Sequence, residues 1–306
     1  MKILIISSNL IGDTILSTGV VDYFHKKYPQ AKFTFLIGPS AGQIYNNFLA
    51  KQKIILIKKK RFNLHWLDMY LNVFKIKWDV IIDFRSSLLS YLLFNKKKYI
   101  FKKKKNINHV DQLKNFFDIE KISLSVATNQ SEEINAAESL SNKHKYIVLF
   151  PGGNWKPKIW PTNNFNQLIV LLNNHFTDLK FIIVGSSKEK NVYLNEIKKN
   201  LPDNLFINLM GETLSSTSAY MKKSNLFIGN DSGLMHLSFA SNLSTIGLFG
   251  PTNDIIYGHR NNKSFVIRTS ESYEYFNNIN IIQNKSYMLS ITPQHILDVI
   301  VKNKLL

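Results

Sequence analysis

The chain has 306 residues, of which 44% are hydrophobic and 12% aromatic; this composition excludes a disordered chain and suffices for one large or two ordinary domains. It contains no cysteine, which excludes disulfides and thiolate metal sites, and its net charge is +18. No apolar run approaches the roughly 18 residues of a membrane-spanning helix, and the one near the N-terminus is too short for a secretory signal. We therefore expect a soluble, cytoplasmic protein.

Apolar runs of strand length alternate with segments of helical periodicity along the chain. The predicted strands are 2–7, 33–37, 54–57, 80–83, 146–150, 181–184, 226–228 and 245–249. Helices are predicted between most of them, for example at 15–28 and 165–176, and the last helix begins with Thr292 as N-cap and Pro293 in its first position. This alternation indicates an α/β fold with parallel sheets covered on both faces.

The stretch 127–145 is polar, has few large apolar residues and precedes a new strand. We place a domain boundary there, which gives a first Rossmann-like domain at 1–140 and a second at 141–306. The final helix, 292–303, is expected to pack back on the first domain. A cleft between two such domains is a common ligand site.

Positive charge is concentrated in residues 51–105, which hold 16 lysines and arginines against three acidic residues. Such a segment attracts nucleic acid, an anionic membrane face or a phosphorylated glycolipid. Compositional drift is the plain alternative, because Lys, Asn and Ile are over-used throughout the chain. Against nucleic acid, the sequence has no RNA- or DNA-binding motif and little basic–aromatic interleaving.

The first strand leads into SSNLIGDTILSTG, residues 7–19, where a nucleotide-binding protein would place its glycine-rich phosphate loop. Gly12 stands alone there, and the acidic Asp13 is beside it. An acidic residue at the start of a helix is stabilised as the anion, so Asp13 is either a helix cap or a functional carboxylate.

Two loops in the second half follow the same pattern of strand, turn and helix. Residues 151–158 form a Gly-Gly turn followed by a loop rich in Lys and Trp, and residues 230–233 (NDSG) stand at a helix start. A helix N-terminus offers free N–H groups to a phosphate, and Lys156 and Lys158 add full charges. Two such loops can hold a diphosphate without a metal. The alternatives are local: caps at Asp231 and Ser232, a tight turn at the glycines, a core histidine at 236 and packing tryptophans at 155 and 160.

These stretches together resemble glycosyltransferase family 9, the heptosyltransferases that use ADP-heptose. NLIGDTILST (9–18) is similar to the opening turn and helix of the family, and PGGNWKPKIWP (151–161) to its Lys-Trp-Pro loop. GNDSGLMH (229–236) followed by LFGPTN (248–253) is similar to its nucleotide loop. WDVIIDFRSSL (78–88) is a weaker match, in which Arg85 and Ser86 stand where the family has Gln-Gly.

The resemblance implies a GT-B architecture, with the acceptor on the first domain and the nucleotide-sugar on the second. It implies an inverting glycosyltransferase that needs no metal and no cofactor. Its partners would be an ADP-sugar donor and an anionic glycolipid acceptor of the lipopolysaccharide-core type, with peripheral contact to the inner membrane through residues 51–105 and no nucleic acid.

The resemblance also assigns roles to residues. Asp13 matches the general base, and Lys158 is the candidate that stabilises the leaving diphosphate. The expected donor-binding residues are Gly152, Gly153, Asn154, Lys156, Glu189, Asp231, Ser232, Gly233, Leu234 and His236. The expected acceptor-binding residues are Gly12, Thr14, Lys58, Lys59, Lys60, Arg61 and Arg85. A family member with another nucleotide-sugar, or a catalytically idle relative, remains an alternative.

Overall fold

A computed structural model describes residues 1–58 and 60–306, without the side chain at position 63. The chain divides into two compact units, Met1–Ala127 and Thr128–Leu306. The boundary lies at 127/128 rather than at 140, because the polar stretch contains a helix, α6, that belongs to the second unit. This helix begins with a capping box in which Asn129 accepts from the backbone N–H of Glu132, and Glu132 accepts in return from that of Asn129.

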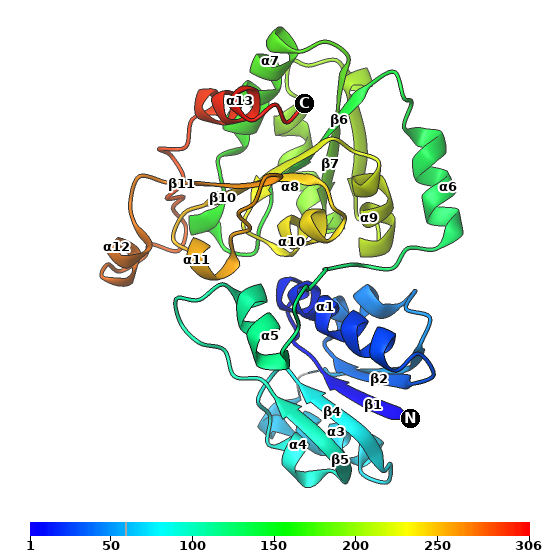
Figure 1. Cartoon of the computed structure of the whole chain (residues 1–306). Coiled ribbons are helices and arrows are strands. Elements are labelled where there is room, and N and C mark those ends of the chain that lie inside the picture. The colour runs from blue at the N-terminus through cyan, green and yellow to red at the C-terminus, as the bar shows by residue number, and fades with distance from the viewer. Residues whose placement is uncertain (59) are drawn as a thin grey trace. The chain divides into compact units, whose positions relative to one another are not determined.

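The first unit is built on a parallel sheet of five strands in the order β3-β2-β1-β4-β5 (Figure 1). The strands are β1 Lys2–Ile6, β2 Lys32–Ile37, β3 Lys51–Leu56, β4 Trp78–Asp83 and β5 Asn95–Ile100. The central strand, β1, is buried from Ile3 onward. Four strands match the predicted ones, and β5 was not predicted, because its lysines interrupt the apolar run.

Helices cover both faces of this sheet. They are α1 Ile11–Lys27, α2 Pro39–Gly42, α3 His65–Val73, α4 Leu89–Leu92 and α5 His109–Phe117, with short 3-10 turns at Gln43–Tyr45 and Arg61–Asn63. On one face, Phe24 of α1 packs on Tyr99 of β5 and Phe117 of α5. On the other, buried residues of α3 and α4 share one apolar cluster with β1, β2 and β4.

Helix α1 is buried around most of its circumference, from Thr14 to Val21. The segment 122–126 crosses it at Gly19, where a Cβ atom would lie 2.5 Å from the Ile122 side chain and 2.9 Å from the Ser123 carbonyl oxygen. Ser125 N–H donates to Thr18 Oγ1 at 3.1 Å beside this crossing. The glycine is therefore needed for a close backbone approach.

The second unit contains a parallel sheet of six strands in the order β11-β10-β9-β6-β7-β8. The strands are β6 Lys145–Phe150, β7 Leu179–Gly185, β8 Phe206–Met210, β9 Leu226–Asn230, β10 Ser244–Phe249 and β11 Ser264–Arg268. All four strands predicted here are present, and β8 and β11, at the two edges, were not predicted.

The helices of this unit again form a layer on each face. They are α6 Gln130–Ser139, α7 Thr162–His175, α8 Ser187–Lys198, α9 Leu214–Lys222, α10 Gly233–Ala240, α11 Asp254–Tyr257, α12 Tyr273–Asn277 and α13 Pro293–Lys302, with 3-10 turns at Lys156–Lys158 and Asp203–Leu205. The predicted start of α13 is confirmed, since Thr292 caps it by accepting from His295 N–H. Its apolar residues join α7 in the core of the second unit, and its packing on the first domain stays a prediction.

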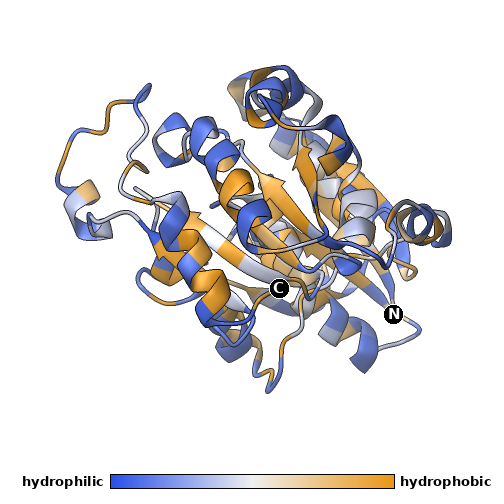
Figure 2. Cartoon of the chain, turned by 90° about the horizontal axis from the view of Figure 1, so that it is seen from above, coloured by the Kyte–Doolittle hydropathy of each residue, from blue (hydrophilic) through white to orange (hydrophobic). Residues whose placement is uncertain are grey.

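Hydropathy follows these layers: the central strands are mostly apolar, while the helices carry polar residues on their outer sides (Figure 2). In each sheet the chain leaves two adjacent central strands in opposite directions, at β1 and β4 in the first and at β6 and β9 in the second. Ligands of open parallel sheets bind at such switch points, outside the carboxyl ends of the strands.

Candidate active site

A pocket of about 320 Å³ opens at the switch point of the first sheet. Its walls come from the segments that follow β1, β4 and β5 and from the start of α5. The lining residues are Ser8, Asp13, Ser17, Phe84, Arg85, Ser86, Phe101, Lys103 and His109. Polar and charged side chains thus converge on one hollow from distant parts of the first unit.

Asp13 lies in the first turn of α1, whose N-cap residue, Leu10, makes no side-chain cap bond. Asp13 is therefore not the N-cap. Its Oδ1 pairs with Lys103 Nζ at 2.7 Å, and its Oδ2 accepts from Ser8 Oγ at 3.3 Å. The side chain is 14% exposed. A carboxylate held this way is oriented toward the pocket and keeps lone pairs for a ligand hydroxyl.

His109, the first residue of α5, also lines the pocket and is buried, 3% exposed. Burial, followed by the positive charge of Lys103, lowers the pKa of His109 to about 4, against an opposing effect of Asp13. The imidazole is therefore neutral at pH 7. Lys103 and Asp13 thus form the charged pair of this pocket, and His109 adds a neutral polar wall.

The loop after β4 is fixed by Asp83, which is fully buried. Its carboxylate accepts from the N–H groups of Arg85 and Ser87, both at 2.8 Å, and from Ser87 Oγ at 2.6 Å. The loop presents Arg85, whose guanidinium lies 5.5 Å from the Trp66 ring. Its Nη1 is buried and has no hydrogen-bond partner in the part of the chain that the structure describes. Arg85 therefore places a buried donor without a partner among the described residues at the wall of the pocket.

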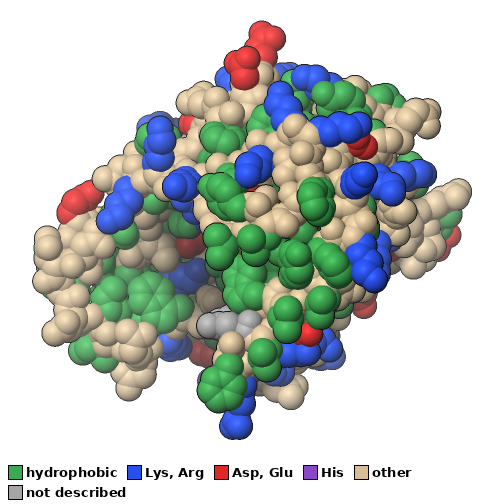
Figure 3. All heavy atoms as spheres, turned by 90° about the horizontal axis from the view of Figure 1, so that it is seen from below, with side chains coloured by type: hydrophobic (Ala, Val, Ile, Leu, Met, Phe, Trp, Pro, Cys, Tyr) green, Lys and Arg blue, Asp and Glu red, His purple; other side chains and the backbone are tan. Residues whose placement is uncertain are grey.

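The other expected acceptor residues do not line this pocket. Thr14 is fully buried, and its hydroxyl bonds within the turn after β1, so it shapes that turn. Gly12 lies half-buried in the same turn. Lys58, Lys60 and Arg61 are exposed before α3, where Lys60 pairs with Asp68, and Lys59 lies outside the described residues. In Figure 3, hydrophobic side chains gather on one face of the molecule with Lys and Arg side chains around them.

Several pocket residues were missed by sequence reasoning. Lys103 was counted only as part of a basic run, and His109 was not considered. The signal that was available is position: Phe101 and Lys103 follow β5 directly, and Asn108 caps the helix that begins at His109. Because β5 was not predicted from the sequence, these residues could not be placed at the end of a strand.

In the second unit, Lys158 and Asp231 meet at the switch point between β6 and β9. Lys158 Nζ lies 3.5 Å from Asp231 Oδ2, and both side chains are largely buried, at 14% and 9% exposed. Lys158 ends a 3-10 turn after β6, and Asp231 directly follows β9. The two predicted loops therefore come together, joined by an ion pair of their own.

Asn230, fully buried at the end of β9, holds these loops in place. Its Nδ2 donates to the carbonyl oxygens of Pro151 at 3.1 Å and Gly152 at 2.9 Å, and its Oδ1 accepts from Trp160 N–H at 3.0 Å. Trp160 is also buried, and its ring nitrogen donates to the Ile291 carbonyl. The expectation that Trp160 packs in the core is confirmed.

Glu189 braces the glycine turn from α8. Its Oε1 accepts from Gly153 N–H at 2.9 Å, while Oε2 accepts from the N–H and hydroxyl of Ser186 in a capping box. A Cβ on Gly152 would lie 2.1 Å from Glu189 Oε1, and Gly153 has φ of 157°, so both positions favour glycine. The Glu189 carboxylate thus has a structural role beside the donor contact expected of it.

Helix α10 begins at Gly233, with Ser232 as N-cap accepting from Met235 N–H at 3.4 Å. Ser232, Gly233 and Leu234 are all partly exposed at this helix start. His236 is buried one turn later, with its Nδ1 2.9 Å from His259 Nε2. Burial, followed by the charge of His236, lowers the pKa of His259 well below its usual value. The neutral His259 packs against α10 through His236 and the ring of Phe239.

The remaining expected donor residues, Asn154 and Lys156, are exposed on the loop after β6. Trp155, between them, is partly buried and donates from its ring nitrogen to Gln283 Oε1 at 2.8 Å. This contact anchors the tip of the loop and leaves the two polar side chains toward solvent.

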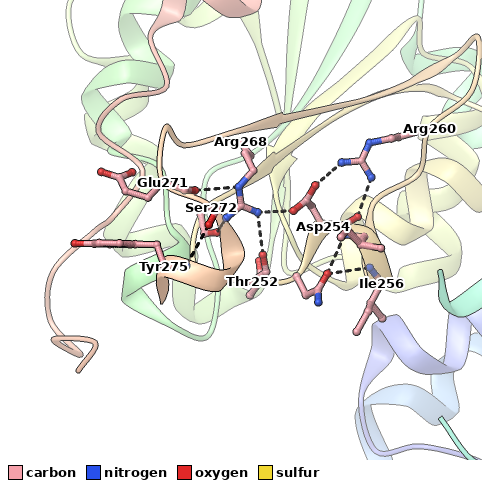
Figure 4. Close-up of polar contacts among 11 residues, drawn as sticks. Thr252, Asp254, Ile256, Arg260, Arg268, Glu271, Ser272 and Tyr275 are labelled. Carbon is pink, nitrogen blue, oxygen red and sulfur yellow. Dashed lines mark hydrogen bonds and ion pairs between the residues drawn. The ribbon is translucent and has the colours of Figure 1, made fainter. Parts of the chain in front are cut away.

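The loop after β10 is held by an arginine network that the sequence did not suggest (Figure 4). Arg268, at the end of β11, donates to the carbonyl oxygens of Gly250 at 2.7 Å and Thr252 at 3.3 Å. Asp254 pairs with both Arg268 and Arg260. The loop 250–253 is therefore fixed beside the other two loops of this sheet edge.

Within residues 1–58 and 60–306 there is no group of three or more His, Asp or Glu side chains arranged to hold a metal ion. No helix in the same ranges has the length and apolar character needed to cross a bilayer.

Two units built on parallel sheets of this kind form the architecture of the GT-B fold. Over 99% of the chain, the fold matches a family 9 glycosyltransferase of Veillonella parvula (TM-score 0.77, 20% identity, 97% of that chain covered). It also matches the heptosyltransferase WaaC of E. coli, solved with ADP (TM-score 0.74, 16% identity, 99% of this chain and 100% of that one covered). The expected GT-B fold is confirmed.

Sequence comparison gives the family. Residues 75–284 match glycosyltransferase family 9 (heptosyltransferase). Lipooligosaccharide heptosyltransferase 2 of Campylobacter jejuni is 27% identical over 270 residues, which cover 82% of each protein. The chain belongs to glycosyltransferase family 9, and it is accordingly a glycosyltransferase of lipopolysaccharide or lipooligosaccharide biosynthesis.

Proposed function

We propose that the chain transfers heptose from ADP-heptose to an anionic glycolipid of the lipopolysaccharide-core type, with inversion at the anomeric carbon. The observation that carries the proposal is the placement of Asp13, a largely buried carboxylate that lines a pocket together with Lys103 and Arg85. A carboxylate fixed at the wall of a pocket is suited to act as a general base.

In the proposed reaction, Asp13 removes the proton from an acceptor hydroxyl while that oxygen bonds to the anomeric carbon. The bond from this carbon to the diphosphate oxygen breaks with its electron pair, so the diphosphate leaves as an anion. Attack from the face opposite the leaving group inverts the configuration in one step. Arg85 and Lys103 offer positive charge to carboxylates or phosphates of the acceptor. Lys58, Lys60 and Arg61 are exposed on the surface outside the pocket and would contact more distant parts of the acceptor.

We assign the leaving diphosphate to the second unit, at the Lys158 turn and the start of α10. Lys158 supplies a full charge, and the N–H groups of Ser232, Gly233 and Leu234 supply fixed dipoles where negative charge develops. Asp231 positions Lys158 through their ion pair. These groups provide the charge that a divalent ion supplies in other transferases, so we propose a reaction that does not require a metal.

The remaining donor contacts follow from position. Gly152 and Gly153 let the backbone of the turn approach the nucleotide, and Asn154 and Lys156 extend toward it from the loop tip. Glu189 offers its carboxylate to the ribose while it holds the Gly153 N–H. His236 supports the start of α10. The relatives support ADP-heptose, since one similar structure was solved with ADP and another with ADP-2-deoxy-2-fluoro heptose.

The location proposed with this chemistry is the cytoplasmic face of the inner membrane, with the protein bound peripherally. The basic segment 51–105 and an anionic, lipid-anchored acceptor support it.

Thermal-shift measurements with ADP, UDP and GDP, with and without magnesium, test the donor assignment. Ligand at about 100 times its dissociation constant adds roughly 2.7 kcal/mol to the free energy of unfolding. We expect a shift with ADP that is independent of magnesium and is lost in Lys158→Ala. Preference for UDP or GDP would replace the donor while keeping the mechanism, and no shift with any nucleotide would favour a catalytically idle relative.

A further inference from the structure

Eight large apolar side chains are exposed within residues 62–94 of the first unit. They are Phe62, Leu64, Leu67, Leu71, Leu88, Tyr91, Leu92 and Phe94, and their exposed fractions range from 52% to 92%. Across all described residues of the second unit, which is more than five times longer than this segment, the same number are exposed. Scattered exposed apolar residues are ordinary, but such a concentration marks an interaction surface.

Four of these side chains, Leu67, Leu71, Tyr91 and Leu92, belong to helices α3 and α4, and the other four directly flank these helices in the chain. Met69 and Val73 of α3 and Leu89 and Leu93 of α4 are buried in the same apolar cluster against the sheet. Both helices therefore cover one face, and their exposed residues point away from it. Figure 3 shows hydrophobic side chains gathered on a face viewed from below Figure 1, the side on which α3 and α4 lie.

Basic residues rim this apolar surface. Lys58, Lys60 and Arg61 are exposed before α3, and Lys75 and Lys77 are exposed after it. On the α4 side, Lys98 Nζ lies 4.4 Å from the ring centre of Tyr91. The one acidic residue on α3, Asp68, is paired with Lys60. The rim is therefore strongly positive.

We propose that the α3–α4 surface docks the protein on an anionic lipid bilayer. Apolar side chains on such a surface insert at the level of the headgroups, while Lys and Arg bind the negatively charged lipids around them. The charge complementarity favours a bilayer over a second copy of this chain, whose own α3–α4 rim would be equally positive and would repel it.

The surface also adjoins the pocket. Trp66 of α3 lies beneath the guanidinium of Arg85, which lines that pocket. Docking through α3 and α4 would bring the mouth of the pocket close to the headgroups. The inference extends the acceptor side of the proposed function, since a lipid-anchored acceptor is presented at this level, but lipid binding itself requires no catalysis.

Co-sedimentation with vesicles tests it directly. Vesicles of phosphatidylethanolamine and phosphatidylglycerol should bind the full chain, with affinity that falls steeply as salt rises, whereas phosphatidylcholine vesicles should bind it weakly. Leu67→Ser with Leu88→Ser should reduce binding strongly. Lys75→Gln with Lys77→Gln should reduce it about 25-fold, since each basic residue near an anionic surface contributes about fivefold.

Matched variants elsewhere serve as controls. Val170→Ser with Leu289→Ser removes exposed apolar residues of the second unit, and Lys143→Gln with Lys302→Gln removes exposed charges there. Both should bind vesicles as the wild type does. The melting temperature of each variant without ligand reports its folding, and its ADP shift reports the donor site. Loss of the ADP shift in all proteins would therefore overturn the donor assignment and leave this inference standing.

Equal binding to anionic and phosphatidylcholine vesicles would overturn the inference, and so would undiminished binding of the Leu67→Ser/Leu88→Ser protein. Self-association without lipid that this variant abolishes would assign the surface to a second copy of the chain instead.

Discussion

The carboxyl edges of the two sheets have the same topology, but the loops that follow their strands differ in composition. At the first edge, between β1 and β4, the turn contains a single glycine and presents a carboxylate, Asp13. At the second edge, between β6 and β9, the turn contains paired glycines, and the ammonium group of Lys158 pairs with Asp231 just before α10 begins. The sheet therefore sets only where a site lies. The loops after its strands decide which side chains the site contains.

Each edge contains a lysine–carboxylate pair, but the two pairs differ in which of their residues come from segments after the switch-point strands. Lys103 reaches Asp13 from a segment after β5, so the carboxylate belongs to the helix at the switch point. In the other pair the carboxylate follows β9 directly and holds the lysine. The comparison predicts that Asp13 matters for proton transfer and Lys158 for the diphosphate.

The largest expected effect follows removal of the proposed base. Asp13→Asn should lower kcat about 10²–10⁴-fold, because the amide keeps the shape of the side chain but cannot take a proton. The ADP thermal shift should be unchanged, since Asp13 lies at the first edge. Steady-state kinetics with ADP-heptose measures this, and an active Asp13→Asn enzyme would remove the chemical distinction between the edges.

Loss of Lys158 should act on the leaving group. We expect Lys158→Ala to raise the transition-state free energy by about 2–4 kcal/mol, by analogy with loss of an oxyanion donor. Lys156→Ala is the comparison in the same turn, and its effect should be much smaller, because that side chain is exposed and screened by solvent. Similar losses in both variants would mean that the turn needs charge but no particular lysine.

The free energy of unfolding of the chain should also depend on pH through His109 at the first edge. The pKa of His109 is lowered from 6.5 to about 4 in the folded chain, mainly by burial. Between these values the unfolded chain binds the extra proton, so the free energy of unfolding should fall as pH decreases from about 6.5 to 4, by up to about 3 kcal/mol. The contribution is fully present above pH 6.5.

Urea unfolding of wild type and His109→Asn across this range isolates the effect. The variant should lose less stability on acidification than the wild type. The pKa of His259 is lowered as well, so both proteins retain the dependence that His259 causes. His295→Asn, at an exposed position, should follow the wild-type curve. Parallel curves for wild type and His109→Asn would contradict the prediction.

The smallest expected effect concerns the glycine turn of the second edge. Gly152→Ala places a methyl group on Glu189 Oε1, and such overpacking costs about 1–3 kcal/mol of stability. Glu189→Ala removes the carboxylate that the methyl group meets, so Gly152→Ala should cost less stability in that background than in the wild type. Denaturant unfolding measures both, and an unchanged stability of Gly152→Ala would show that the turn is adaptable.

The sequence predicted the central strands well and the edge strands poorly. β5, β8 and β11, the three missed strands, all lie at sheet edges, where less of the strand is covered and the apolar run is interrupted. Helix α6 was hidden by its polar composition, although the capping box at Asn129 was a local signal for it.

The site was predictable where a single motif contains the residue. Asp13, Lys158 and Asp231 lie in quoted motifs, and the structure places them at the two switch points. Lys103, His109 and the Arg268 network reach the edges through long-range folding, which no short pattern in the sequence reports. Thr14 also lies in a quoted motif, and the structure places its hydroxyl in hydrogen bonds within the turn after β1.

The side chain of Asn230 bears on how such enzymes can be altered. This side chain hydrogen-bonds to the carbonyl oxygens of Pro151 and Gly152 and to the N–H of Trp160. These bonds fix the loop after β6 to the end of β9, where the second loop begins. Grafting either loop alone from a relative with a different sugar would leave buried polar groups unpaired. Donor preference in this scaffold should therefore be exchanged by transplanting both loops together, with the asparagine that ties them.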